Sequence, residues 1–328
     1  MRVVVTGGAG FIGRALVKKL ASGGVDVVAL VRDPAKASHL EGPHVTLAAS
    51  DLKDTAATAA IMRGADGVIH AAGSYRLGIA PAERPGMLDA NLGTTERVLD
   101  AAIEAKVRRI VYVSTVNVFG DTHGEVVDET YRRDPNTTKG RFVSFYDESK
   151  FRAHLAAEER IAQGAPIVIV QPAQVYGPHD HSWFGEQLGL AFRGKLPYLA
   201  FPTTGVAPVH VDDVSEAIVA ALVRGRVGQS YVLAGVPQRS RDAYEVAARV
   251  GGHRLPRITF PTFLLRLIAP INDRKAGGFT GLPPNLREGI SAGHKVTYWA
   301  SSAKAMKELG FAARPLKKGV ADVYGRTT

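Results

Sequence analysis

A glycine-rich turn near the start of the chain constrains the fold more than any other feature. Three valines at positions 3–5 are followed by Thr6 and by glycines at positions 7, 10 and 13, and a helical pattern of apolar residues begins at Ile12. A strand, a tight turn and a helix in this order let the backbone approach a pyrophosphate, whose charge the helix N-terminus favours. The segment therefore predicts a dinucleotide site with contacts from Gly7, Gly10, Phe11, Ile12 and Gly13.

Short β-branched runs alternate with helical patterns along the first half of the chain. Most of these runs are continuously apolar, as expected of strands that are buried on both faces of a parallel sheet. The alternation predicts an α/β fold with a doubly wound parallel (Rossmann) sheet. The expected strands are residues 3–5, 27–31, 45–47, 68–70, 110–114 and 167–171.

The second half of the chain changes character, because Gly, Pro and aromatic residues interrupt the pattern after residue 176 and again after residue 236. Residues 209–223 between these parts are expected to return to the sheet as a strand and a helix. We expect a dinucleotide-binding domain of residues 1–176 and 207–236. Residues 177–206 and 237–328 would form a smaller, discontinuous C-terminal substrate-binding lobe.

Composition narrows the classes of protein. Of the 328 residues, 45% are hydrophobic and 22% are charged, which is ordinary for a globular chain and excludes a largely disordered one. There are no cysteines, so disulfides and cysteine nucleophiles are excluded, and no cluster of His, Asp and Glu has metal-ligand spacing, so no metal is expected. The net charge of +10 is scattered, which favours an evenly basic, solvated surface; an anionic cofactor or substrate is the next interpretation, ahead of nucleic acid.

The N-terminal residues and the apolar segments predict a cytoplasmic protein. Residues 1–5 lead straight into the glycine turn, and no segment reaches the roughly 18 apolar residues of a membrane span. The nearest stretch, residues 260–271, is interrupted by Arg266 and two prolines. We expect it to form a buried helix; an amphipathic lid or a lipid-facing patch is the alternative.

The residues after the second expected strand indicate which dinucleotide is bound. Arg32 comes first and Asp33 follows. An arginine here accommodates a ribose 2′-phosphate, whereas an acidic residue hydrogen-bonds the 2′-hydroxyl of NAD. We therefore expect NADP, with Lys36 assisting and with NAD as the alternative. The competing interpretation is that Asp33 and Pro34 cap the next helix while Arg32 points to solvent.

Tyr146 and Lys150 are the candidates for proton transfer. Residues four apart on a helix share a face, and this is the only Tyr-x-x-x-Lys spacing in the chain. An ammonium group near a phenol lowers the pKa of the phenol and makes it usable as a general acid or base. Thr115 ends a strand at the edge where ligands bind in such sheets, so its hydroxyl could orient the substrate oxygen towards Tyr146. Ser114 would point to the opposite face.

Taken together, the motifs resemble the extended short-chain dehydrogenase/reductases, also called the NAD-dependent epimerase/dehydratase family, over nearly the whole chain. The segments that carry the resemblance are 6–13, 51–52, 70–73, 91–94, 113–120, 146–150, 171–178 and 210–214. The resemblance implies hydride exchange with a nicotinamide cofactor, in which Tyr146 moves a proton and Lys150 also holds the nicotinamide ribose. It also implies a homodimer through the helices at 91–105 and 146–163.

The same resemblance implies the remaining cofactor contacts. Asp51 and Leu52 would lie beside the adenine. Residues from the fourth, fifth and sixth strands would line the cofactor, namely Ala71, Ala72, Gly73, Ser114, Pro172 and Val175 in addition to Tyr146 and Lys150. Gln171 stands where the family usually has an arginine.

Departures from the family pattern narrow the reaction. Val116 and Asn117 follow Thr115, so the acidic residue of the family's dehydratases and decarboxylases is missing. Before residues 209–213 there is no arginine of the kind with which nucleotide-sugar epimerases grip a diphosphate, although Arg193 and Lys195 could substitute for it.

Other segments resemble the dihydroflavonol-reductase-like branch, which includes ketone and aldehyde reductases. These segments are 31–34 and 193–197. We therefore expect an NADP(H)-dependent oxidoreductase that reduces a carbonyl of a small organic substrate or oxidises the secondary alcohol. A nucleotide-sugar epimerase and a hydroxysteroid-dehydrogenase-like enzyme are the alternatives, and the intact Tyr146–Lys150 pair disfavours a non-enzymatic cofactor sensor.

Loops over the site are expected to supply the substrate pocket. The candidates are Tyr75, Arg76, Trp183, Phe184 and Tyr198. His210 is expected to be structural, with Asp212 or Asp213 capping the helix that follows.

Overall fold

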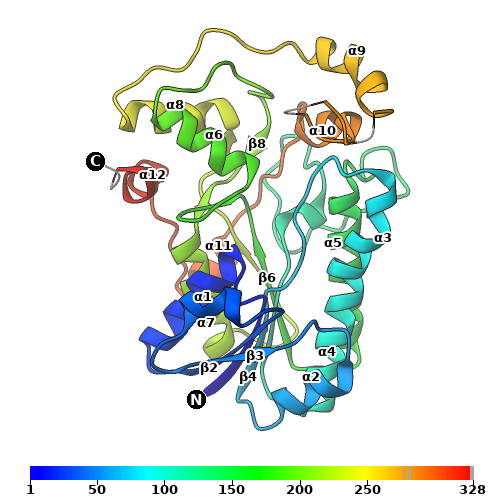
Figure 1. Ribbon diagram of the computed structural model, residues 1–328, viewed down its shortest axis with the longest axis vertical. Coiled ribbons are helices and arrows are strands. Elements are labelled where there is room, and N and C mark those ends of the chain that lie inside the picture. The colour runs from blue at the N-terminus through cyan, green and yellow to red at the C-terminus, as the bar shows by residue number, and fades with distance from the viewer. Residues whose placement is uncertain (276, 280–281, 326–328) are drawn as a thin grey trace.

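Seven parallel strands form the centre of the computed structural model, which describes residues 1–275, 277–279 and 282–325 (Figure 1). The order reverses between β1 and β4, which creates the switch point where ligands bind in doubly wound folds. The predicted sheet is thus confirmed. In spatial order the strands are β3 (Val45–Ala49), β2 (Asp26–Val31), β1 (Arg2–Thr6), β4 (Gly67–His70), β5 (Ile110–Val113), β6 (Ile167–Pro172) and β10 (Ser230–Leu233).

The return to the sheet after β6 differs from the prediction. Residues 209–210 form β9 (Val209–His210), which pairs with β7 (Val175–Tyr176) outside the central sheet. Helix α7 (Val211–Arg224) begins directly after β9 and covers the sheet, so the seventh strand comes only after this helix, at β10. The sequence analysis named no strand there.

Helices cover both faces of the sheet, which explains why the strands are apolar along their whole length. Val3 and Val5 belong to a core beneath one set of helices, and Val4 belongs to a second core on the opposite face, as the alternation of a strand requires. One face is covered by α1 (Phe11–Ser22), α7 and α11 (Ala303–Leu309), and the other by α2 (Thr55–Met62), α4 (Thr94–Glu104) and α5 (Phe145–Ala162) (Figure 1).

The remaining helices form a lobe beyond one end of the sheet. They come from two separate parts of the chain and have their own small cores. β8 (Gly205–Val206) pairs antiparallel with β11 (Gln238–Arg239) at the base of this lobe. The helices are α6 (Trp183–Phe192), α8 (Ser240–Val250), α9 (Thr262–Asn272), α10 (Leu286–Gly293) and α12 (Leu316–Tyr324) (Figure 1). The domain boundaries given above stay a prediction.

Short helical segments connect the strands to the longer helices. α3 (Arg84–Leu88) continues through a π-helical turn, η3 (Asp89–Gly93), into α4. The other short turns are η1 (Ala35–Leu40), η2 (Pro81–Glu83) and η4 (Val116–Phe119).

Helix α9 is far less buried than the sequence analysis expected. Leu265, Ala269 and Asn272 are its buried residues, whereas Phe263 and Leu267 are 62% and 66% exposed. The prediction of a buried helix is therefore wrong. The physical reason is the position of α9 at the edge of the lobe, where α10 packs along one side and the other side faces solvent (Figure 1). Even so, no helix in the described ranges combines the length and the apolar character that a membrane crossing needs.

His70 ties the sheet to α4 at the switch point. It is fully buried as the last residue of β4, with Nδ1 2.7 Å from the Thr6 hydroxyl and Nε2 3.1 Å from the Thr95 hydroxyl. The Thr95 hydroxyl donates to the Asn91 carbonyl, so Nε2 of the imidazole is the donor to Thr95. Burial, helped by Lys150, lowers the pKa of His70 to about 3.

His70 should make the fold sensitive to acid. The unfolded chain takes up a proton near the ordinary pKa of 6.5, which the folded chain binds only near its lowered pKa of about 3. The contribution of His70 to the free energy of unfolding is therefore complete above pH 6.5. It is lost as the pH falls below 6.5, by up to about 1.4 kcal/mol per pH unit. Urea unfolding at a series of pH values gives the slope of the free energy of unfolding against pH. The His70 part of this slope should be absent in His70→Gln and should be kept in the exposed control His39→Gln. An unchanged slope in His70→Gln would contradict this assignment.

Candidate active site

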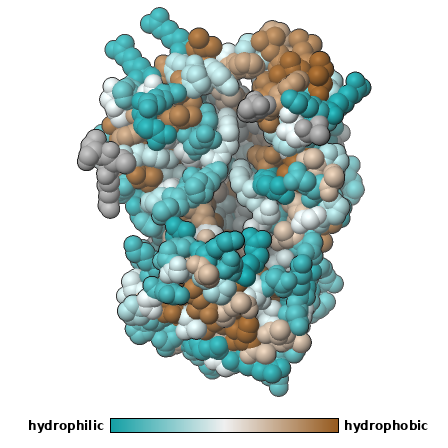
Figure 2. All heavy atoms as spheres, in the orientation of Figure 1, coloured by the Kyte–Doolittle hydropathy of each residue, from teal (hydrophilic) through white to brown (hydrophobic). Residues whose placement is uncertain are grey.

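A large cavity lies between the sheet edge and the helical lobe. Its volume is about 1250 Å³, and it is visible as the hollow between the two parts of the molecule in Figure 2. The carboxyl ends of the strands form its floor, and the lobe supplies its roof. The predicted site residues that line it are Gly10, Phe11, Ile12, Gly13, Ala71, Ala72, Gly73, Ser114, Thr115, Tyr146, Lys150, Pro172 and Val175, whereas Gly7, Arg32, Asp51 and Leu52 lie outside its lining.

The glycine turn fits an anionic group at the floor of the cavity. Gly7 has φ +71°, and a Cβ atom there would come within 2.7 Å of the Ala72 backbone. A Cβ atom at Gly13 would lie 2.0 Å from the Gly7 carbonyl oxygen, so the helix can approach the turn only without side chains. The N-terminus of α1 has no side-chain cap and no acidic residue in its first turn. Its free N–H groups can therefore hold a pyrophosphate.

Arg32 and Asp33, which directly follow β2, differ in their contacts. Asp33 accepts hydrogen bonds from the Ala35 and Lys36 amides, and its carboxylate lies 3.4 Å from the Lys36 ammonium group. Arg32 is exposed and forms no ion pair with any described residue. These are the contacts that the competing interpretation expects, in which Asp33 and Pro34 cap the next turn, and they do not distinguish NADP from NAD. Arg14, which the sequence analysis missed, lines the cavity in the first helical turns of α1 and is likewise unpaired among the described residues. The spacing of Arg14, one residue after Gly13, was the signal that could have found it.

Asp51 and Leu52, which the sequence analysis expects beside the adenine, are held by local contacts. The Asp51 carboxylate accepts a hydrogen bond from the Lys53 amide at 3.0 Å, and Asp51 remains exposed. Leu52 is buried with φ +61°, and its carbonyl accepts a hydrogen bond from Arg97 Nε at 2.9 Å.

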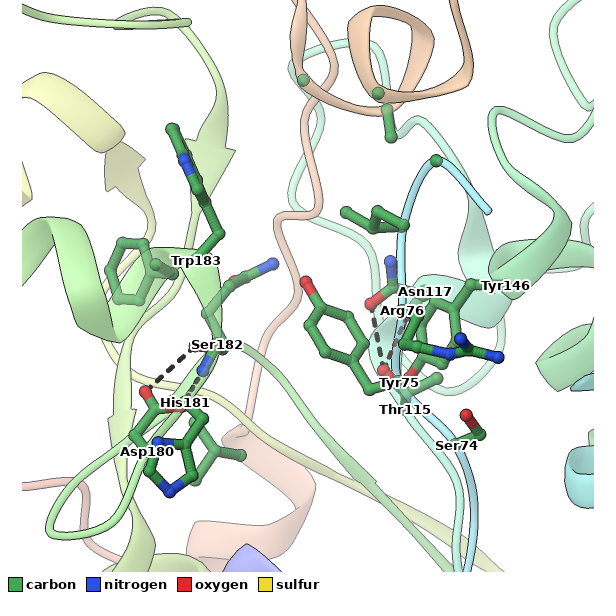
Figure 3. Close-up of a pocket in the computed structure, with 18 of the residues that line it drawn as sticks. Ser74, Tyr75, Arg76, Thr115, Asn117, Tyr146, Asp180, His181, Ser182 and Trp183 are labelled. Carbon is green, nitrogen blue, oxygen red and sulfur yellow. Dashed lines mark hydrogen bonds between the residues drawn. The ribbon is translucent and has the colours of Figure 1, made fainter. Parts of the chain in front are cut away.

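Thr115 and Tyr146 face one another across the cavity floor, beside Tyr75 and Asn117 (Figure 3). The Thr115 hydroxyl donates to the Asn117 side-chain oxygen at 3.0 Å. Tyr146 lies in the first turn of α5, which Ser144 caps by accepting the Asp147 amide at 3.1 Å. The neighbouring Ser114 is engaged elsewhere, with its hydroxyl 3.0 Å from His154 Nδ1. Thr115 is therefore the hydroxyl that is available to Tyr146.

Lys150 does not act on Tyr146 in the way that the sequence analysis expected. Burial, and secondly the Tyr75 phenol, raise the pKa of Tyr146 above its usual 10, and the hydrogen bond with Thr115 opposes this rise. The Lys150 ammonium group turns to the Tyr112 hydroxyl and the Val113 carbonyl, each at 3.3 Å. The expected lowering of the phenol pKa is therefore wrong for the unliganded protein, because the shared helix face does not fix the direction of a long side chain.

An ion pair that the sequence analysis missed fixes the start of α5. The Arg133 guanidinium donates to both carboxylate oxygens of Asp147, at 2.5 and 2.9 Å, and both side chains are almost fully buried. The same guanidinium donates to the carbonyls of Gly140 and Arg141. Because Asp147 directly follows Tyr146, this clamp sets the position of the phenol. Arg133 lies in a loop without regular structure, so no periodic pattern could have revealed it.

Asn91 forms a second clamp on the same helix. Its amide group donates to the Ser149 hydroxyl at 2.9 Å and to the Ser74 carbonyl at 3.1 Å, and its oxygen accepts the Ser74 amide at 2.7 Å. The loop that carries Tyr75 is thereby held against α5. As a result the Tyr75 ring stands edge-on to Tyr146, with ring centroids 4.9 Å apart.

The roof of the cavity is apolar. The predicted pocket residues Tyr75, Arg76, Trp183, Phe184 and Tyr198 all line the cavity, and Trp183 lies across from Tyr146 in Figure 3. Arg76 is neutralised by Glu83 at 2.6 Å. The lobe also contributes one carboxylate to the lining, Asp180, which accepts hydrogen bonds from the Ser182 amide at 2.8 Å and the Ser182 hydroxyl at 3.0 Å, and the histidines at 179 and 181. From Trp183 onward, none of the described lining residues is charged. The apolar members of this roof are Phe201, Phe260, Leu265, Ile268, Leu282 and Leu286.

Several other predicted residues lie away from the cavity lining. Arg193 and Lys195 do not line it. His210, rather than Asp212 or Asp213, caps α7 by accepting the Asp212 amide at 3.2 Å, because Asp213 is occupied by Arg314. No group of three potential ligands among the described residues could hold a metal ion.

Gln171, which stands where the resemblance leads us to expect an arginine, is buried without side-chain polar contacts. It is 1% exposed in β6, and neither polar atom of its side-chain amide has a hydrogen-bond partner. It lines a smaller cavity of about 70 Å³ that lies apart from the catalytic residues.

Comparison with protein-family models identifies the class of protein. Residues 3–234 match the NAD dependent epimerase/dehydratase family. The chain therefore belongs to this family, whose members use the cofactor that the glycine turn predicts.

Similar curated proteins include reductases as well as a UDP-glucose 4-epimerase and a dTDP-glucose 4,6-dehydratase. The chain is 28% identical over 325 residues to a Synechocystis protein that is named, provisionally, as a dihydroflavonol 4-reductase, covering 97% of this chain and 92% of that protein. It is also 28% identical over 321 residues to the 4-hydroxy-2-methyl-3-oxo-4-farnesyl-3,4-dihydroquinoline-1-oxide ketoreductase of Stigmatella aurantiaca, covering 96% and 92% of the two chains.

Similar solved structures share the fold over the whole chain. The structure of a protein named gox2253 has a TM-score of 0.81 and 30% identity, and the match covers 98% of this chain and 96% of that one. The UDP-glucuronic acid 4-epimerase of Bacillus cereus, solved with UDP-glucuronic acid and NAD, has a TM-score of 0.78 and 19% identity, with 99% and 98% covered. The second likeness concerns the fold alone.

Removing the Arg133 clamp should destabilise the protein strongly. Arg133→Met leaves the buried Asp147 carboxylate without its partner, so the free energy of unfolding should fall by about 3–5 kcal/mol. The matched control Arg132→Met removes an exposed arginine and should change it by less than about 0.5 kcal/mol. Urea unfolding of the two variants measures both values. Equal stabilities would contradict the proposed role of the clamp.

Proposed function

We propose that the protein is an NADP(H)-dependent reductase of ketones or aldehydes carried by bulky, apolar molecules, and that it catalyses the reverse oxidation of the secondary alcohol. The observation that carries the proposal is the position of Tyr146 and Thr115, where the glycine turn meets a largely aromatic and aliphatic roof without arginine or lysine, whose one carboxylate, Asp180, is bonded to Ser182. Residues 177–206 and 237–328 would act as the substrate lobe. The oligomeric state stays a prediction.

The polarity of the roof supports an apolar substrate. A nucleotide sugar carries a diphosphate, which proteins hold with unpaired cations. The cations of the described lining are Arg14 near the glycine turn, Lys150 on the floor and the neutralised Arg76, in addition to the histidines at 179 and 181. Arg193 and Lys195, the candidates for a diphosphate grip, lie outside the lining. The likeness to a ketoreductase named for a farnesylated quinoline favours the same class.

The roles of the residues follow from their protonation. A bound nicotinamide would supply the hydride to the carbonyl carbon, or accept it in the reverse direction. The raised pKa keeps the Tyr146 phenol protonated, so it can donate a proton to the carbonyl oxygen as the C–H bond forms. The Thr115 hydroxyl would hold the same oxygen. Lys150 has three N–H donors, of which two are engaged, so the third remains for a ribose hydroxyl.

The choice of NADP rests on Arg32. This guanidinium is exposed at the carboxyl end of β2 without an ion pair among the described residues, while Asp33 is occupied by its own turn. An unpaired guanidinium at this position suits a 2′-phosphate. The unpaired Arg14 adds positive charge on the floor of the cavity.

A nucleotide-sugar epimerase that uses its cofactor transiently is the second candidate, because the family includes epimerases. The lack of arginine and lysine in the roof, within the described lining, argues against it. The candidates also differ in what leaves the enzyme: an epimerase returns its cofactor unchanged, whereas a reductase consumes one NADPH for each product.

Replacing Tyr146 by Phe should remove the proton donor and keep the site in shape. Turnover of a bulky ketone should fall at least about 100-fold, with NADPH affinity within a few-fold of wild type. Tyr176→Phe is the matched control, because the Tyr176 hydroxyl is buried without a hydrogen-bond partner and lies outside the cavity lining. Stopped-flow measurement of NADPH oxidation reads both variants. Full turnover in Tyr146→Phe would rule out the assigned role.

Replacing Arg32 by Ala should weaken NADPH binding selectively. Loss of a charge-assisted contact predicts roughly 10- to 100-fold weaker NADPH binding, with NADH affinity nearly unchanged. Arg241→Ala, an exposed arginine on α8, removes the same charge elsewhere and should leave both affinities as they are. Fluorescence titration with each cofactor measures the change. Equal losses for NADPH and NADH in Arg32→Ala would assign the phosphate contact to another residue.

A further inference from the structure

Helix α9 presents a hydrophobic surface to solvent. Phe263, Leu267 and Ile271 recur every four residues on its outer side and are 62%, 66% and 62% exposed, with Leu264 beside them at 39%. We call these four residues the outer face of α9. In Figure 2 it appears as the hydrophobic area at the upper right, over the position of α9 in Figure 1. Large apolar side chains gathered in this way mark a surface that has a partner.

Basic side chains lie on α9 and directly after it, at Arg266, Arg274 and Lys275, and two more, Arg254 and Arg257, lie on the segment that leads from α8 to α9. Residues 254–275 contain five basic residues and one acidic residue. All five basic side chains are exposed, and none forms an ion pair with a described residue; they are Arg254, Arg257, Arg266, Arg274 and Lys275. The single acid, Asp273, is half-buried, accepts the Leu286 amide at 2.6 Å and lies 3.8 Å from Arg287. The side chains on and directly after α9 therefore give the surroundings of the outer face a net positive charge.

The charge decides between the surfaces that could cover the outer face. In a symmetric contact between two copies, the same patch meets itself, so Arg266, Arg274 and Lys275 would face their own counterparts. Like charges across such a contact are unfavourable. An apolar helix face rimmed by lysine and arginine is instead the arrangement with which helices lie in the interface of an anionic bilayer.

We propose that the outer face of α9 docks the protein on the surface of a lipid bilayer that carries anionic headgroups. Phe263, Leu267 and Ile271 insert at the boundary between headgroups and acyl chains, and the surrounding arginines and Lys275 contact the phosphates. The helix lies in the surface and does not cross the bilayer, consistent with its length of 11 residues.

The position of α9 connects membrane docking with substrate entry, and this connection rests on the proposed function. The inner side of the same helix contributes Leu265 and Ile268 to the cavity lining. One helix thus separates the outer apolar face from the apolar roof. A bulky apolar ketone dissolved in the bilayer would then reach the cavity without crossing water.

The experiment is a vesicle sedimentation assay on the full chain. Vesicles of phosphatidylcholine alone are compared with vesicles that also contain phosphatidylglycerol, at low and at physiological ionic strength. We expect binding to the anionic vesicles to be at least about tenfold stronger, and to weaken with salt. Binding that is absent, or equal for both vesicle types, would overturn the proposal.

Two pairs of variants separate the apolar and the basic contributions. Phe263→Ser with Leu267→Ser should weaken binding at least about tenfold, whereas Val223→Ser with Met306→Ser, exposed apolar residues elsewhere, should not.

Replacing Arg266, Arg274 and Lys275 by Gln should weaken binding roughly 100-fold. The control is the triple Gln variant of Lys18, Lys307 and Lys317, which removes the same charge from other exposed positions. Equal loss in a control variant would overturn the proposal. Thermal unfolding confirms that each variant is folded.

Other partners give distinct results. Sedimentation velocity would show a dimer that Phe263→Ser with Leu267→Ser dissociates, if a second copy covered the outer face. If the protein bound polyglutamate as tightly as anionic vesicles, and Phe263→Ser with Leu267→Ser did not weaken this binding, the surface would be a site for acidic polypeptides. Either result would overturn the proposal. Tyr146→Phe should bind vesicles like the wild type, so a failure of the reductase assignment is distinguishable from a failure of membrane docking.

Discussion

The close contact between the glycine turn and the switch point of the sheet is the constraint on which the site depends. Gly7 lies against the backbone of Ala72, and Gly13 lies against the carbonyl of Gly7, with no space for a Cβ atom at either position. This contact places the uncapped N-terminus of α1 at the carboxyl edge of the strands. Its free N–H groups and the side chains that follow β4 and β5 consequently share one cavity.

The chemistry at the other end of the floor depends on how α5 begins. The Arg133–Asp147 pair and the Asn91 amide hold the first turns of this helix from two sides, and Tyr146 lies between them. Burial raises the pKa of the phenol, and the roof above it holds no arginine or lysine among the described lining residues. On this basis we propose carbonyl reduction in preference to chemistry on a diphosphate sugar.

The parts of the fold that the sequence predicted are those set by local rules. The apolar runs became the strands β1 to β6, because strands covered on both faces need apolar residues throughout. The glycine spacing and the Tyr146–Lys150 spacing are local in the same sense. Arg133 could not be found, because its partner is 14 residues away and its loop has no period. The direction of Lys150, the exposure of α9 and the place of β10 depend on tertiary packing, which a sequence pattern does not contain.

The most direct test of the central claim follows the hydride. NADPH that carries deuterium at C4 is incubated with the protein and a bulky, apolar ketone, and the product is examined by mass spectrometry and NMR. With deuterium at both C4 positions, the account predicts one deuterium on the carbinol carbon of the secondary alcohol for each NADPH oxidised. A parallel reaction replaces the ketone by a UDP-sugar. No deuterium in the ketone product, together with a UDP-sugar that changes its configuration, would contradict the account and identify an epimerase.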